Sequence, residues 1–85
     1  MDTRFRHDRT IRLLEARLES LALASEQRPA AERRLERQIV ATVAATRHAV
    51  ALELISREEA GALWADVARR HPDARWCAAG PGLAA

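Results

Sequence analysis

The sequence has few residues that could cross-link or anchor a small domain. Cys77 is its single cysteine, so no disulfide can form within the chain. Cysteine and histidine do not occur at the spacing of a zinc site, and no uncharged run approaches the roughly 20 apolar residues that span a bilayer. A chain of 85 residues buries only about 60–65% of its unfolded surface. We therefore expect a partner to add stability, and we predict no metal and no cofactor.

Lysine and tyrosine are absent, and glycine and proline contribute three residues each. Alanine, leucine, arginine and glutamate dominate, a composition typical of helices. All fourteen basic residues are arginine. Arginine suits the recognition of phosphate or carboxylate groups, although a GC-rich genome accounts for its abundance more simply. The charged start, Met1 to Arg6, lacks the apolar core of a signal peptide, so we expect a cytoplasmic protein that spans no membrane.

Two helices are predicted in the first two thirds of the chain, at about 8–24 and 29–55. In the first, Asp8 suits the N-cap, and apolar residues step by three and four along a seam, namely Ile11, Leu14, Leu18 and Leu21. Pro29 suits the first position of the second helix. The short connection makes the two helices antiparallel neighbours. Residues 1–7 are expected to form a flexible arm that contains arginine.

The second helix is expected to carry more apolar surface than one neighbour can cover. One side of its helical wheel holds Ile39, Val43, Val50 and Leu54. Arg47 falls within this stripe, where a charge must be paired or must reach solvent. Two interpretations stay open. Either Arg47 binds an anion or a carboxylate of a second copy, such as Glu36 or Glu53, or its stem lies over alanines and its guanidinium reaches water.

A third helix is predicted at about 56–71. Ser56 and Glu59 have the spacing of a capping box, and the apolar residues that follow recur at helical spacing. Pro72 ends the helix. The tail, residues 73–85, is expected to be partly disordered. Within it, Trp76 is predicted to fold back on the helices as a lid, with an anchor for a partner as the alternative.

The sequence therefore predicts an all-α fold, an antiparallel helical hairpin plus a third amphipathic helix. This three-helix unit forms one domain at 8–72 and is expected to be completed as a dimeric bundle. The expected function is self-association, or service as an accessory subunit of a larger protein. The predicted partner interface consists of Ile39, Val43, Arg47, Val50, Leu54, Leu63, Trp64, Val67 and Trp76.

Nucleic-acid binding is the alternative function. The arginine-rich segments 4–12 and 28–37 offer phosphate contacts through Arg4, Arg6, Arg9, Arg33, Arg34 and Arg37. In an antiparallel hairpin these segments lie at opposite ends, so only a dimer could bring them together. Arg47 loosely resembles the internal arginines that, together with a lysine, form the sites of the small all-α chorismate mutases. Because this chain has no lysine, we expect no catalytic activity.

Overall fold

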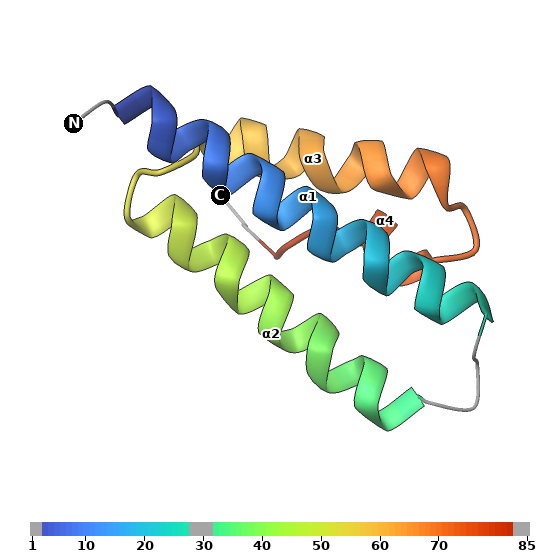
Figure 1. Cartoon of the computed structure of the whole chain (residues 1–85). Coiled ribbons are helices and arrows are strands. Elements are labelled where there is room, and N and C mark those ends of the chain that lie inside the picture. Colours follow the sequence, from blue (N-terminus) through green and yellow to red (C-terminus); the bar gives the residue numbers. More distant parts are fainter. Residues whose placement is uncertain (1–2, 28–31, 83–85) are drawn as a thin grey trace.

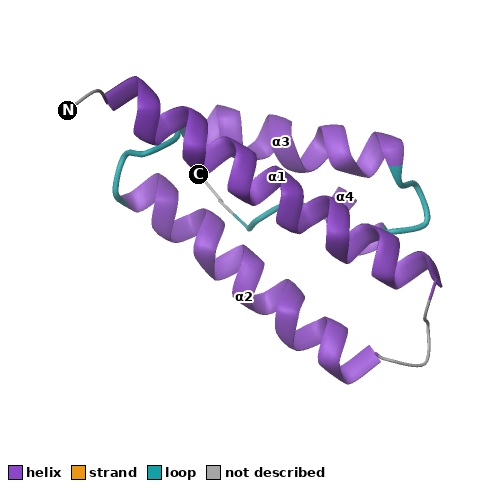
Figure 2. Ribbon diagram, in the orientation of Figure 1, coloured by secondary structure: helices purple, strands orange, loops and turns teal. Residues whose placement is uncertain are grey.

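Four helices make up the part of the chain that the computed structural model describes, residues 3–27 and 32–82. They are α1 (Thr3–Gln27), α2 (Glu32–Ala51), α3 (Arg57–Arg70) and the short α4 (Arg75–Ala78). α1 lies between α2 and α3, with α1 and α3 running in one direction and α2 in the other (Figures 1 and 2). The all-helical, up-down-up arrangement is therefore confirmed. Within the described ranges, no helix has both the length and the apolar character needed to cross a membrane.

α1 is longer than predicted at its start. It begins at Thr3 and not near Asp8, so the prediction of a flexible arm is wrong for residues 3–7. The physical reason is a tertiary contact, because the His7 side chain reaches Glu59 on α3 and gives the first turns of α1 something to pack against. The predicted start of the second helix, at Pro29, lies outside the described residues.

α2 ends at Ala51, earlier than the predicted residue 55. The backbone turns at Glu53, whose φ of 59° lies in the left-handed region. The Leu54 amide donates to the Ala49 carbonyl (2.9 Å), and the Glu53 amide donates to the Val50 carbonyl (3.0 Å). These two bonds form a Schellman motif, which satisfies carbonyls that the helix end would otherwise leave without donors. The turn separates α2 from α3 without a glycine or proline.

The predicted capping box begins α3 and is confirmed. The Glu59 amide donates to the Ser56 hydroxyl (3.0 Å), and the Ser56 amide donates to the Glu59 carboxylate (2.9 Å). Two amides at the helix start are thereby satisfied. Because Ile55, just before the cap, is buried, the junction is fixed by packing as well as by hydrogen bonds.

The core lies mainly between α1 and α3. Leu14, Leu18 and Ala22 on α1 belong to one buried cluster with Trp64 and Val67 on α3. Leu18 and Val67 have no exposed surface, and Trp64 retains only 1%. Full burial of such side chains stabilises a fold by about 1.5–3 kcal/mol each. The seam predicted for the first helix is thus the one that packs.

The face of α2 that meets the core carries threonines. Thr42 and Thr46 have no exposed surface, and Ala49 is buried beside them. The Thr42 hydroxyl donates to the Gln38 carbonyl (2.7 Å), and the Thr46 hydroxyl donates to the Thr42 carbonyl (2.8 Å). Thr46 also accepts a hydrogen bond from Trp64 Nε1 (3.2 Å). Because both hydroxyls have partners, their burial avoids the cost of an unsatisfied polar group.

The C-terminal segment folds back on the helices, as predicted for Trp76. Its ring meets that of Trp64 edge to face, with centroids 5.8 Å apart and planes at 90°, a favourable aromatic geometry. The indole N–H of Trp76 donates to the Ser25 hydroxyl on α1 (3.4 Å). Trp76 is therefore a lid over the α1–α3 core.

The rest of this segment also packs on the core. Its buried residues are Ala74, Cys77 and Pro81. The Cys77 thiol donates to the Trp64 carbonyl (3.3 Å). Residues 73–82 are thus part of the packed domain, which corrects the prediction of a partly disordered tail there. Residues 83–85 lie outside the described part of the chain.

Candidate interaction surface

α2 lies at the edge of the bundle, and the side that faces away from α1 is uncovered (Figure 1). Val40 on this helix is 68% exposed, and Leu52, just after its end, is 57% exposed. Ala41, Ala44 and Ala51 are exposed as well. Small side chains allow a second helix to approach closely, and neighbouring exposed apolar residues are typical of interaction sites. The outer side of α2 is therefore the candidate interaction surface.

Arg47 lies on this exposed side of α2. Its neighbour Thr46 faces the core, and successive residues are turned about 100° apart around a helix, so Arg47 is directed toward solvent. The aliphatic stripe of the predicted helical wheel is half-buried at the edge of the core, because Thr42, Thr46 and Ala49 occupy the buried side of α2. The guanidinium reaches water in the single chain, and it stays available to a carboxylate on a second molecule.

The other residues of the predicted interface divide into two groups. Leu63, Trp64 and Val67 are buried on α3. They are core residues of the single chain, which corrects the prediction that they contact a partner, because α1 and the C-terminal segment already cover them. The second group is half-buried at the edge of the core and comprises Ile39, Val43, Val50, Leu54 and Trp76. These side chains keep some surface toward solvent.

The two arginine-rich segments lie at opposite ends of the hairpin, because α1 begins where α2 ends (Figure 1). All six predicted phosphate contacts are exposed, namely Arg4, Arg6, Arg9, Arg33, Arg34 and Arg37. Residues 28–31 of the second segment lie outside the described part of the chain. One molecule does not present the two segments as a continuous basic surface.

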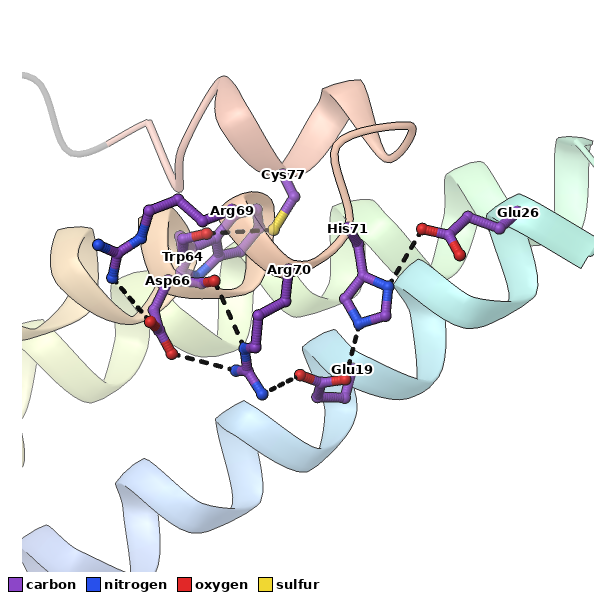
Figure 3. A network of polar contacts seen from close by, with 8 residues as sticks. All are labelled: Glu19, Glu26, Trp64, Asp66, Arg69, Arg70, His71 and Cys77. Atoms are coloured by element: carbon purple, nitrogen blue, oxygen red, sulfur yellow. Dashed lines mark hydrogen bonds and ion pairs between the residues drawn. The ribbon is translucent and has the colours of Figure 1, made fainter.

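A network of polar side chains ties the end of α3 to α1 (Figure 3). His71 is placed between two carboxylates of α1, with Nε2 2.8 Å from Glu19 and Nδ1 3.1 Å from Glu26, and both nitrogens donate when the ring is protonated. Arg70 forms ion pairs with Glu19 and, at 3.2 Å, with Asp66. The hydrogen bond to Glu19, reinforced by Glu26, raises the pKa of His71 above its ordinary value.

A second histidine joins the opposite ends of the same two helices. His7 on α1 donates from Nδ1 to Asp8 (3.1 Å) and contacts Glu59 on α3 through Nε2. The hydrogen bonds to Asp8 and Glu59 raise the pKa of His7. The pKa of Glu59 is lowered, first by the Ser56 amide and then by His7. α1 and α3 are thus held together at both ends by imidazole–carboxylate pairs.

Neither histidine belongs to a motif that the sequence reveals. Each partner on the other helix is 45 or more positions away along the chain. No short motif links residues that far apart, so the pairs depend on the parallel alignment of α1 and α3. They stabilise the scaffold that presents α2.

Among residues 3–27 and 32–82, no cluster of three or more histidine, cysteine, aspartate or glutamate side chains could hold a metal ion. Burial raises the pKa of the Cys77 thiol, which keeps it protonated and weakly nucleophilic. Comparison with protein-family models, curated proteins and solved structures finds no match to this chain.

Proposed function

We propose that this chain is a small helical self-association module without catalytic activity of its own, acting as a homodimer or as an accessory subunit within a larger assembly. The proposal rests on the observation that the chain's own core covers only one side of α2. Threonines and an alanine face its own core, while Val40 remains 68% exposed on the outer side. A second copy that covers this side removes apolar surface from water, the main driving force of association.

The free energy that each covered side chain can contribute to association is modest. Covering an exposed valine or leucine stabilises association by at most about 1.5–3 kcal/mol, and association costs several kcal/mol of translational and rotational freedom. Several side chains along α2 must therefore contribute together. We expect a dimer that dissociates on dilution, in the micromolar range.

The oligomeric state of two matched variants tests this surface. Val40→Glu places a charge on the outer side of α2, and we expect a monomer with unchanged helix content by light scattering and circular dichroism. Leu13→Glu makes the same change at an exposed residue of α1, 61% accessible, and should leave the dimer intact. A wild-type chain that is monomeric at high micromolar concentration would contradict the proposal.

Nucleic-acid binding is a second candidate, favoured by the exposure of all six arginines in the two basic segments. If it is correct, affinity for duplex DNA of arbitrary sequence should fall by about tenfold or more between 50 and 200 mM salt. Size exclusion with added duplex separates the two functions. A dimer that does not bind DNA at low salt supports self-association alone.

A further inference from the structure

The outer side of α2 has a pattern that matches its own reversed copy. Glu36, Val40 and Arg47 are exposed, and Val43 and Val50 are half-buried at the edge of this side. Their positions advance by four, three, four and three, the spacing of a seam along which two helices can pack. The seam has valines at its middle, an acidic residue toward one end and a basic residue toward the other.

This order makes antiparallel pairing self-complementary. In a two-fold arrangement centred between Ala41 and Thr42, residues whose numbers sum to 83 face each other. Val40 then meets Val43 of the second copy. Glu36 meets Arg47 of the second copy, and by symmetry the same ion pair forms twice.

Resting on the self-association proposed above, we propose that α2 pairs with α2 of a second copy in the antiparallel direction, with two Glu36–Arg47 ion pairs flanking a central cluster of four valines. Neither Glu36 nor Arg47 forms an ion pair with another residue of the described part of the chain. Both charges are therefore available to the second copy. Arg47, a charge beside an apolar row, has a defined partner in this arrangement.

The competing arrangements along the same face are less favourable. Parallel pairing would place Glu36 against Glu36 and Arg47 against Arg47, and like charges in register repel. If each α2 helix were turned about its axis so that the neighbouring row with Ala44 and Ala51 formed the contact, Arg37 would face Arg47 of the second copy. A shift by one heptad would place Arg47 against Val43, without a carboxylate. The antiparallel register centred at 41–42 combines contact between valines with ion pairs between opposite charges.

Charge reversal tests the register, measured by sedimentation equilibrium. In Glu36→Arg, two arginines face each other at both ends of the interface, and in Arg47→Glu two glutamates do. Because each variant replaces two attractions with two repulsions, we expect the dimer dissociation constant to rise by about tenfold or more. Matched controls with the same changes in net charge are Glu58→Arg and Arg57→Glu, two exposed residues of α3, and these should leave the constant unchanged within about twofold.

Mixing the two charge-reversed chains should restore dimer formation. An equimolar mixture of the Glu36→Arg and Arg47→Glu chains restores both opposite-charge pairs, so it should form a heterodimer of near wild-type affinity. The doubly reversed chain should also form a homodimer. Folding defects cannot mimic this result, because the two impaired chains repair each other only through contact.

The outcomes separate this inference from the function on which it rests. A wild-type monomer overturns both. A wild-type dimer in which Glu36→Arg and Arg47→Glu behave like the α3 controls overturns the proposed register and leaves self-association standing. Weakened single variants that do not associate when mixed also overturn the register. Weakened single variants that associate when mixed support it.

Discussion

Replacing Thr46 with valine tests the polar contact that joins α2 to the core. The Thr46 side chain has no exposed surface, and its hydroxyl accepts the indole N–H of Trp64 at 3.2 Å. Valine keeps the shape and the branched Cβ but leaves this buried N–H without an acceptor. An unsatisfied buried donor costs about 1–3 kcal/mol. The gain from burying a methyl group in place of the hydroxyl offsets part of it, about 0.8 kcal/mol.

We therefore expect Thr46→Val to lower the free energy of unfolding by up to about 2 kcal/mol. Thr42→Val is the matched control. Thr42 is equally buried, but its hydroxyl donates only to the Gln38 carbonyl one turn earlier in the same helix. That carbonyl can keep its helical hydrogen bond, so the control should be neutral or slightly stabilising. Urea unfolding measures the stability of both variants. The chain concentration is kept fixed because association adds to stability.

A double-mutant cycle with Trp64→Phe isolates the hydrogen bond. Phenylalanine removes the indole N–H, so Thr46→Val should cost little in that background, and the two changes should couple by about 1 kcal/mol or more. A stabilising role for the Trp64–Thr46 hydrogen bond would be refuted if Thr46→Val were as stable as Thr42→Val. It would also be refuted if Thr46→Val cost the same with phenylalanine at 64.

Two further predictions concern the turn at Glu53 and the histidine–carboxylate pairs. Glu53→Gly should raise the free energy of unfolding by about 0.5–1 kcal/mol, because glycine adopts the φ of 59° without strain; Glu53→Ala, the control, should bring no such gain in the same denaturant titration. Stability should also fall above neutral pH. The pKa values of His7 and His71 are raised above 6.5 in the folded state, so their contribution is complete below pH 6.5 and is lost as the pH rises through the raised values. Glu59, whose pKa is lowered from 4.5, contributes above pH 4.5 and loses its contribution as the pH falls through the lowered value. Thermal unfolding from pH 4 to 9 should therefore show a maximum between the two limits, and a His71→Gln chain should lose part of the alkaline decline; a profile that is flat above pH 6 for the wild type would contradict the histidine pairs.

Much of the fold was predictable because the relevant signals are local. The spacing of Leu14, Leu18 and Leu21 marks the buried side of α1. Ser56 and Glu59 mark the start of α3, because a capping box needs only residues three positions apart. The order and direction of α1, α2 and α3 follow from such signals together with short connections, whereas the short α4 was not predicted.

The candidate surface was harder to predict, and α2 shows why. Its aliphatic and alanine residues are spread around most of the helix, so the hydrophobic pattern does not select one buried side. The structure buries Thr42 and Thr46, neither of which is among the apolar residues of the predicted stripe. A threonine can satisfy its hydroxyl on its own helix, and Trp64 supplies a second reason to bury Thr46. Arg47 is exposed, in agreement with the interpretation in which its guanidinium reaches water, because the buried side of α2 is the threonine side.

The sequence by itself determined that this chain is helical and where the α3 cap lies, because these depend on contacts within one or two turns. It also determined which way the helices run, because the connections between them are short. Tertiary structure alone decided that His71 would sit between Glu19 and Glu26, and which side of α2 would be left uncovered. Those choices depend on which distant side chains a packed core brings together, and periodicity along one helix does not contain that information.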